Sequence, residues 1–321
     1  MQSLKNSAVR LAGRLGMQSA LLRLELRRRA HSAGLRLERD PGGALVLTAP
    51  SANGSPARAV RIAAGHGPYA FDVVSHFDYY HGAVAAHDVG GVAVVDYSRT
   101  GPQTLLPSGD VFTFTGFPEP EATTQVYLHH ARLKEGDVAL DFGAYCGGST
   151  VRMARAVGPS GQVYAYEPDP MNAAALDDNL ARHGIDNVTI VRAGVWSSTT
   201  TLEFAAEGNL GSAVAALLPR AQKSRQVEVF SMADVVKRMG ERQRGIAFVK
   251  MDIEGAEVPA LEAGLQALDT QRPRFAIEPH ALPNGELNTQ ILVDLLERHG
   301  YAIELADQGI GVHPLILAQA A

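Results

Sequence analysis

A single cysteine, Cys146, occurs in the 321 residues, so the chain cannot form an internal disulfide or a cysteine-rich zinc site. No apolar run reaches the length of about 18 residues that a membrane-spanning helix needs, and no signal-peptide core is present. A net charge of -5 gives no general attraction to nucleic acid. These absences predict a cytoplasmic protein without a membrane span or a nucleic-acid partner, and 46% hydrophobic residues indicate a substantial core.

The sequence divides into three regions that differ in composition and hydrophobic pattern. Residues 1–33 are basic and carry apolar residues near helical spacing, which predicts an amphipathic helix. This helix either packs on the body of the protein or contacts an anionic membrane surface, and its composition also overlaps with that of organellar transit peptides. Residues 34–119 contain short apolar runs divided by glycine and proline, which predicts a small, mainly β region. Residues 120–321 alternate strand-like and helix-like runs and are predicted to form a second domain.

The segment 69–81 in the small region is unusually rich in aromatic and histidine residues for a chain with 6% aromatics. Packing in the core of that region or in an interface is the first interpretation. The alternative is that polar members of the segment and its surroundings cover the acceptor side of a substrate pocket. The residues concerned are His76, Asp78, Tyr80, His81 and His87.

A turn of small residues follows a buried strand in the second domain. The apolar run 138–142 contains Asp141, and Gly143, Ala144 and Gly147 come next, before a helix predicted over 149–157. Glycines at such a turn let a ligand approach the backbone, beside the positive end of the helix dipole. The spacing differs from G-x-G-x-x-G, which argues against a dinucleotide and leaves room for a smaller adenosyl group.

The next strand, 163–167, ends in Glu167, about twenty residues beyond Gly147. From that position a carboxylate reaches a ribose hydroxyl pair. Asp169 and Pro170 predict the start of a helix directly afterwards. Trp196 follows the third strand at the same edge, where it either walls in an adenine or packs in the core.

A second group of polar residues lies at two later strand ends. The run 247–257 carries Lys250, Asp252 and Glu254, which share one face if the strand stays regular throughout. The run 274–280 ends in Glu278 and His280. Because open α/β sheets bind ligands at the carboxyl ends of their strands, these five residues are the catalytic candidates. The chain then ends in a predicted amphipathic helix over 288–299 and an antiparallel hairpin around Gly309–Gly311.

The four motifs LDFGAYCGGST, YAYEPDP, VKMDIEGAE and IEPH, in this order, resemble those of class I S-adenosylmethionine-dependent methyltransferases, and within them the FkbM family. The resemblance extends from about Phe77 to the C-terminus. It implies a Rossmann-like α/β fold with a mostly parallel seven-stranded sheet and a C-terminal antiparallel hairpin. It also implies S-adenosylmethionine as the cofactor and a hydroxyl oxygen of a sugar, lipid or polyketide-like metabolite as the methyl acceptor. The cofactor-binding residues that it implies are Asp141, Gly143, Ala144, Tyr145 and Gly147 around the methionine part, and Glu167 with Pro168 at the ribose.

Methyl transfer requires in-line positioning at about 3–3.5 Å and a group that takes the acceptor's proton. Asp252, Glu278 and His280 are the candidate bases, and His280 has an ordinary pKa near the operating pH. We expect no metal, although Asp252 and Glu254 with Glu278 or His280 offer an alternative divalent cation site. A nicotinamide-dependent oxidoreductase and a cofactor-binding protein without turnover are the alternative functions. The acceptor and the oligomeric state stay open.

Overall fold

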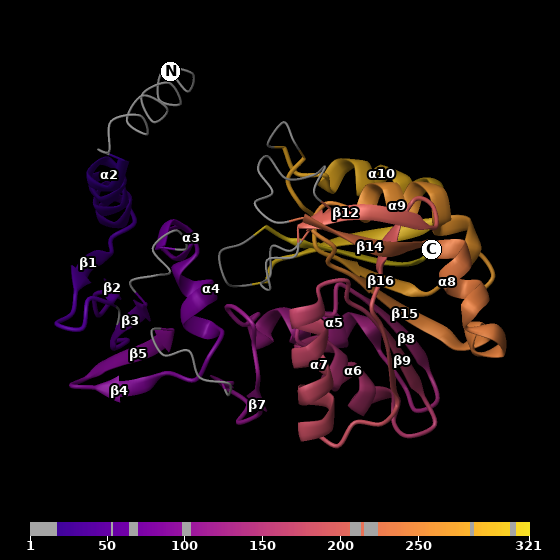
Figure 1. Cartoon of the computed structure of the whole chain (residues 1–321), viewed down its shortest axis with the longest axis horizontal. Coiled ribbons are helices and arrows are strands. Elements are labelled where there is room, and N and C mark those ends of the chain that lie inside the picture. The colour runs from indigo at the N-terminus through magenta and orange to yellow at the C-terminus, as the bar shows by residue number, and fades with distance from the viewer. Residues whose placement is uncertain are drawn as a thin grey trace. The chain divides into compact units, whose positions relative to one another are not determined.

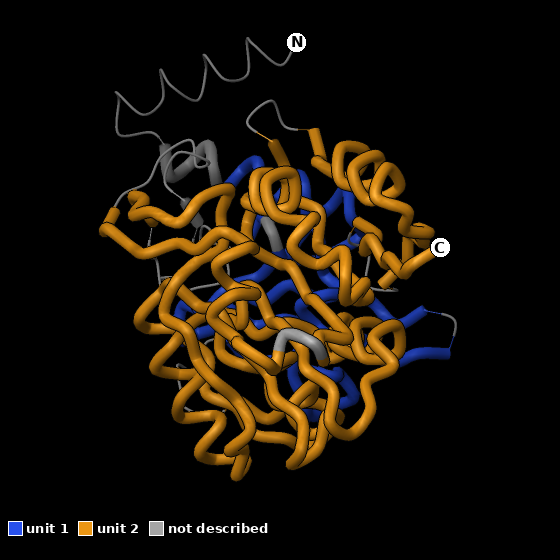
Figure 2. Tube along the Cα trace, turned by 90° about the vertical axis from the view of Figure 1, so that its right-hand side faces the viewer, with its two compact units in different colours: residues 1–101 blue, residues 102–321 orange. Residues whose placement is uncertain are grey.

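Residues 18–52, 54–63, 70–97, 104–205, 213–214, 224–282, 286–308 and 313–321 are described in the computed structural model of the chain. The expectations for residues 1–17, for Tyr69 and for the turn at 309–311 fall outside these residues. The chain divides into two compact units, residues 1–101 and 102–321, which Figure 2 shows in different colours.

The first unit contains a five-stranded sheet with the order β1-β2-β3-β5-β4. Only β3 and β5 pair in parallel among these strands, and the crossover between them contains α3 and α4 (Figure 1). The apolar runs at 44–48, 59–62 and 91–95 coincide with β2, β3 and β5. The elements are α2 (Gln18–Ser32), β1 (Arg36–Arg39), β2 (Leu45–Ala49), β3 (Ala57–Ile62), α3 (Ala70–Ser75), α4 (Phe77–Gly82), β4 (His87–Val89) and β5 (Val92–Tyr97).

The aromatic and histidine segment forms α3 and α4 and packs inside the first unit. Phe77 is buried and stacks on His81, with 5.9 Å between the ring centroids. The Nε2 atom of His81 lies 3.0 Å from the carbonyl oxygen of Ala93, and burial lowers the pKa of His81. Tyr97 donates a 2.6 Å hydrogen bond from its hydroxyl to the carbonyl oxygen of Tyr80. These contacts agree with the core interpretation of the segment.

The basic helix α2 is anchored by a narrow apolar stripe. Leu26 and Ala30, four residues apart, are buried, whereas Leu24 is 67% exposed. The guanidinium of Arg29 lies 5.4 Å from the centroid of the Phe71 ring in α3. Among the helices of the described residues, none is both long enough and apolar enough to cross a membrane.

The second unit is built on a seven-stranded sheet with the order β10-β9-β8-β15-β16-β18-β17. Five neighbouring strands are parallel, and β18 is antiparallel to both of its neighbours, which confirms the predicted fold class and the C-terminal hairpin. The strands are β8 (Val138–Phe142), β9 (Gln162–Tyr166), β10 (Val188–Val191), β15 (Ile246–Met251), β16 (Arg274–Ile277), β17 (Tyr301–Ala306) and β18 (Leu315–Ala320).

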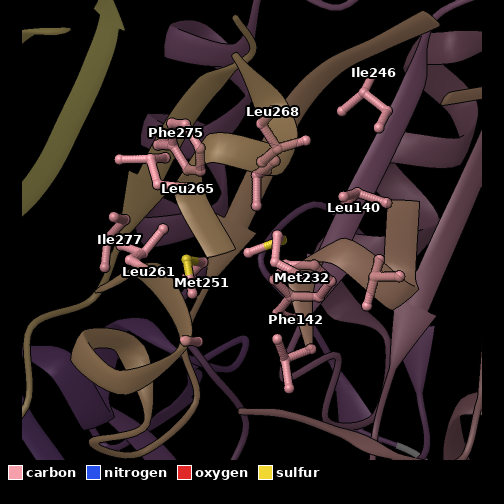
Figure 3. Close-up of a cluster of buried hydrophobic side chains, with 14 of the residues drawn as sticks. Leu140, Phe142, Met232, Ile246, Met251, Leu261, Leu265, Leu268, Phe275 and Ile277 are labelled. Atoms are coloured by element: carbon pink, nitrogen blue, oxygen red, sulfur yellow. The ribbon is translucent and has the colours of Figure 1, made fainter. Parts of the chain in front are cut away.

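Helices cover both faces of this sheet (Figure 1). On one face, α8, α9 and α10 enclose a large apolar cluster with Phe142 of β8 and Met251 of β15 (Figure 3). On the other face, α5 and α6 pack against Ala139 and Phe248 from the same two strands. The helices are α5 (Glu121–Ala131), α6 (Gly148–Val157), α7 (Pro170–Arg182), α8 (Met232–Arg238), α9 (Glu257–Gly264) and α10 (Thr289–Arg298), with short 3₁₀ turns at Gly240–Gly245 and Leu265–Leu268.

Two helix starts have side-chain caps, and the first of them was predicted from the sequence. The side chain of Asp169 accepts hydrogen bonds from the N–H groups of Met171 and Asn172, with Pro170 at the first position of α7. Ser231 accepts one from the N–H of Asp234 at the start of α8. A four-stranded sheet and a two-stranded sheet complete the unit. Their strands are β11 (Gly194–Trp196), β14 (Ser224–Ser231), β12 (Thr200–Ala205) and β13 (Ala213–Val214), and β6 (Thr104–Leu105) with β7 (Val111–Phe112).

Candidate active site

The glycine turn after β8 brings three strand ends close together. Gly143 has φ +78°, and a Cβ atom there would lie 1.8 Å from the carbonyl oxygen of Asp252. Gly147 has φ +88°, and its Cβ would lie 2.3 Å from Cδ1 of Leu176 in α7. The N–H groups of Gly143 and Ala144 donate to the carbonyl oxygen of Tyr166 at the end of β9. Glycine is therefore needed at both positions, because the backbone is left-handed and atoms of other segments of this chain occupy the place of a Cβ atom.

Asp141 and Lys250 form a buried ion pair beneath this turn. Neither side chain is exposed, and Lys250 Nζ lies 3.4 Å from Asp141 Oδ1. The other oxygen of Asp141 accepts hydrogen bonds from the hydroxyls of Ser149 and Thr150. Lys250 donates a 2.6 Å hydrogen bond to the carbonyl oxygen of Gly143. Burial alone would lower the pKa of Lys250, but the nearby carboxylates raise it, so the ammonium is a fixed charge that holds β8 and β15 together.

Glu167 lies at the end of β9 with its carboxylate turned toward the glycine turn. It accepts 2.8 Å hydrogen bonds from the N–H groups of Tyr145 and Asp169, one on each oxygen. Burial raises the pKa of Glu167 to about 8, against the effect of these two donors. Oε1 also accepts a longer hydrogen bond of 3.5 Å from Nδ2 of Asn172, whereas the second lone pair of Oε2 is directed at no other donor among the described residues.

A pocket opens between these strand ends and the four-stranded sheet. Of the sequence-derived candidates, Gly143, Tyr145, Glu167, Pro168, Asp252 and Glu254 line it, whereas Asp141, Ala144, Gly147, Lys250, Trp196, Glu278 and His280 are not among its lining residues. The complete lining consists of Glu119, Gly143, Tyr145, Tyr166, Glu167, Pro168, Asn172, Gly194, Val195, Phe204, Val229, Asp252, Ile253, Glu254 and Ala256.

Trp196 belongs to a small apolar cluster on the four-stranded sheet. It is half-buried and packs against the cluster formed by Phe204, Val227 and Val229. Two of these neighbours, Phe204 and Val229, line the pocket themselves. Of the two interpretations of Trp196, the structure therefore favours packing.

Glu119 is a pocket residue that the sequence analysis missed. Its carboxyl group forms a side-chain hydrogen bond with Asp252, and burial raises the pKa of Glu119 to about 8. Burial would also raise the pKa of Asp252, but Lys250 and His280 hold it below its ordinary value. Asp252 therefore carries the negative charge of the pair and Glu119 carries the proton at neutral pH.

The segment that carries Glu119 is fixed by Tyr145. The hydroxyl of Tyr145 accepts a 2.9 Å hydrogen bond from the N–H of Gly116 and donates one of 3.2 Å to the carbonyl oxygen of Phe117. Pro118 and Pro120 flank Glu119 and restrict the backbone on both sides. The two flanking prolines are the sequence feature that could have indicated a fixed position for the Glu119 carboxyl group.

The turn after β15 places Glu254 differently from the expected regular strand. The strand ends at Met251, and Glu254 has φ +53°. The buried carboxylate of Glu257 accepts hydrogen bonds from the N–H groups of Ile253 (3.0 Å) and Gly255 (3.3 Å) and thereby holds the turn. Burial raises the pKa of Glu254 to about 7.

His280 lies among three carboxylates. Its Nδ1 is 3.0 Å from Oε1 of Glu257, and its Nε2 is 3.6 Å from both Oδ1 of Asp252 and Oε2 of Glu254. Burial alone would lower the pKa of His280, but the carboxylates, with Glu257 first, raise it well above its ordinary value. The expectation of a neutral imidazole with a pKa near 6.5 is therefore wrong, because this arrangement keeps the ring protonated at neutral pH.

Glu278 contacts a different group of residues. Its Oε1 lies 2.8 Å from Nε2 of His313 and 3.4 Å from Nε2 of Gln308. Of the alternative ligand sets for a cation, the structure thus brings Asp252 and Glu254 together with His280. Their three ligand atoms lie within 4.8 Å of one another.

Comparisons with known proteins point to methyl transfer. A family model described as "Methyltransferase FkbM domain" matches residues 141–303, just over half of the chain. The curated 31-O-demethyl-FK506 methyltransferase FkbM of Streptomyces tacrolimicus is 28% identical over 211 residues, which cover 56% of this chain and 79% of that protein.

Two solved structures with similar folds are methyltransferases by description. Methyltransferase FkbM from Methylobacillus flagellatus has 19% identity and a TM-score of 0.42; the match covers 61% of this chain and half of that one. A SAM-dependent methyltransferase from Aquifex aeolicus has 15% identity and a TM-score of 0.38, with 62% and 89% of the two chains covered.

Proposed function

The chain belongs to the FkbM family of methyltransferases, and on this basis we propose that it transfers the methyl group of S-adenosylmethionine to a hydroxyl oxygen of a sugar, lipid or polyketide-like acceptor. The observation that carries this proposal is the pocket with Glu167 at the end of β9 and a group of acidic side chains after β15.

The chemistry of the pocket suits S-adenosylmethionine in three respects. The apolar side chains of Val195, Phe204 and Val229 offer a surface for the adenine. Glu167 offers acceptors for the ribose hydroxyls. Asp252 and Glu254 supply negative charge, which favours a ligand with a positive sulfonium and a positive amino group.

The same lining disfavours a nicotinamide dinucleotide. Among the described residues that line the pocket there is no lysine or arginine, and three of its side chains are acidic besides Glu167. A pyrophosphate carries negative charge, would find no cationic lysine or arginine in this lining and would be repelled by the carboxylates of Asp252 and Glu254. Both the charge of the pocket and the spacing of the glycines therefore argue against the oxidoreductase alternative.

An oxygen acceptor is supported by the relative from Streptomyces tacrolimicus, whose name describes a 31-O-demethyl substrate. Transfer to a hydroxyl requires a group that receives the acceptor's proton, and the candidates are the carboxylates of Asp252 and Glu254, which line the pocket beside His280. Most of the acceleration then comes from holding the acceptor oxygen in line with the methyl group.

Transfer of a labelled methyl group from S-adenosylmethionine to cell extract, fractionated into sugars, lipids and small metabolites, tests the proposal. We expect label in one hydroxyl-bearing fraction with the wild type and a loss of at least about tenfold with Asp252→Asn. The matched control Asp177→Asn changes an exposed carboxylate on α7 and should transfer normally. A protein that binds the cofactor but labels no fraction would support the alternative of a binding protein without turnover.

A further inference from the structure

We propose that Asp252, Glu254 and His280 bind one divalent first-row transition cation, with Mn²⁺ as the representative ion, at the edge of the pocket. The proposed binding of the cation rests on the geometry of these side chains and their neighbours and does not depend on methyl transfer. Its role in catalysis rests on the proposed methyl transfer.

The distances among the three ligand atoms suit a shared ion. Nε2 of His280 lies 3.6 Å from one oxygen of each carboxylate, beyond hydrogen-bonding distance, and all three atoms lie within 4.8 Å of one another. Ligands bound at about 2.0–2.2 Å from a cation lie roughly 3–3.5 Å apart when they are neighbours around it. Small side-chain rotations of Asp252 and Glu254 are enough to close this difference.

A second, independent observation is the way in which the imidazole is oriented. Nδ1 of His280 is hydrogen-bonded to Glu257, which has no exposed surface, so Nε2 faces the two carboxylates, and a cation that displaces the Nε2 proton would find the nitrogen lone pair directed at it. Asn288, also without exposed surface, accepts from the backbone N–H of His280 and donates to the second oxygen of Glu257. A histidine tied to a carboxylate through its other nitrogen is the usual support of a metal-binding imidazole.

The two oxygens of Asp252, which also shares a hydrogen bond with Glu119, face two different cationic side chains. Oδ2 lies 3.5 Å from the ammonium of Lys250, whereas Oδ1 faces His280. One oxygen therefore serves the buried ion pair and the other is turned toward the ligand cluster.

The donor set decides the kind of cation. One imidazole nitrogen with two carboxylate oxygens suits Mn²⁺, Fe²⁺, Co²⁺ or Zn²⁺, while Ca²⁺ favours six to eight oxygens. The cluster contains no sulfur ligand, which disfavours Cu⁺. Three ligands leave coordination positions for water or for an oxygen of the acceptor.

If the chain transfers a methyl group as proposed, the cation activates the acceptor hydroxyl. An acceptor hydroxyl bound to the ion loses its proton more readily, and the proton passes to water or a carboxylate. The oxygen then forms a bond to the methyl carbon as the bond from sulfur to that carbon breaks. The electron pair of the broken bond stays on sulfur, which becomes a neutral thioether.

Titration of the full-length protein with MnCl₂, followed by electron paramagnetic resonance of free Mn²⁺, measures the site without any methyl transfer. We expect one Mn²⁺ per chain, and nitrogen modulation from the imidazole in the electron spin echo of the bound ion. His280→Ala should abolish this modulation and weaken binding at least about tenfold. Glu257→Gln keeps the three ligands but releases the imidazole, so it should weaken binding about 10–100-fold. Glu262→Gln, an exposed carboxylate on the same helix as Glu257, is the matched control and should bind like the wild type.

Absence of saturable Mn²⁺ binding in the wild type overturns the proposal, and so does bound Mn²⁺ without nitrogen modulation. Because both readouts come from the wild type, an unstable variant does not obscure the result. Calorimetric binding of S-adenosylmethionine in the presence of a chelator tests the proposed function separately. Cofactor binding without Mn²⁺ binding would refute the cation site alone, and Mn²⁺ binding without cofactor binding would refute the proposed function alone.

Discussion

Glu257 holds His280 in place, with 3.0 Å between Oε1 of the carboxylate and Nδ1 of the imidazole. The same oxygen accepts hydrogen bonds from the N–H groups of Ile253 and Gly255. A residue that the sequence offers only as an acidic helix start therefore fixes both the turn after β15 and the imidazole after β16. The positions of Glu254 and His280 relative to each other depend on this one buried carboxylate.

Affinity for S-adenosylmethionine should depend on pH through Glu167. Burial raises the pKa of this carboxyl group to about 8, and the ionised form is the better acceptor for ribose hydroxyls. Affinity should therefore rise with pH, by at most about tenfold per unit below pH 8, and flatten above it. Calorimetry from pH 6 to 9 measures this. Glu167→Gln should remove the rise that belongs to this residue, and an unchanged rise in that variant would assign it to another group.

Gly143→Ala should destabilise the second unit strongly. The new Cβ would lie 1.8 Å from the carbonyl oxygen of Asp252, in a left-handed backbone conformation. We expect a loss of about 3 kcal/mol or more in the free energy of unfolding, measured with urea. Gly184→Ala is the control, because φ there is +62° and nothing lies within 4 Å of its Cβ position. That change should cost only about 1–2 kcal/mol, and equal losses at both positions would contradict the role given to close backbone approach.

Lys250→Met should reveal a structural rather than a reactive lysine. Removal of the ammonium leaves the buried carboxylate of Asp141 without its charge partner and takes away the hydrogen bond to Gly143. We expect a loss of about 3–5 kcal/mol in the free energy of unfolding. Wild-type stability combined with a loss of methyl transfer would instead assign Lys250 a direct part in the reaction.

A fragment that begins at Pro102 tests part of the prediction that the region 34–119, through its aromatic and histidine segment 69–81, covers the acceptor side of the pocket. The fragment retains Leu106 and Phe112, which pack against Val151 and Leu176 of the second unit. We expect it to bind S-adenosylmethionine like the full chain and to lose methyl transfer to the acceptor. Full transfer by the fragment would show that the first unit has no part in acceptor binding.

Much of the fold was predictable because its signals are local. The apolar run at β8, the capping residues Asp169 and Ser231, and the reversed strand β18 all follow from patterns within a few residues. The two short helices α3 and α4 were not predicted, since the aromatic segment has no clear period and its contacts with β5 are formed only in the folded unit.

The candidate site was predictable in its strand ends but less so in its contacts. Asp252 and Glu254 were placed by the strand that precedes them, and Glu167 by its spacing from the glycine turn. Glu119 was missed because it lies far before the strand ends in the sequence. The hydrogen bonds between the Tyr145 hydroxyl and the backbone of Gly116 and Phe117 bring its segment to the pocket. The pKa of His280 was misjudged because it is set by carboxylates from separate parts of the chain.

Binding of S-adenosylmethionine to the wild type and to Glu167→Gln is the measurement that tests the central claim most directly. Two hydrogen bonds to the ionised carboxylate are each worth about 1.5–3 kcal/mol, and the amide retains at most part of them. We therefore expect 1:1 calorimetric binding to the wild type, a loss of at least about tenfold in the variant at pH 8.5, and no competition by NAD. Equal affinity of a folded variant, or displacement of S-adenosylmethionine by NAD, would contradict the assignment of this pocket.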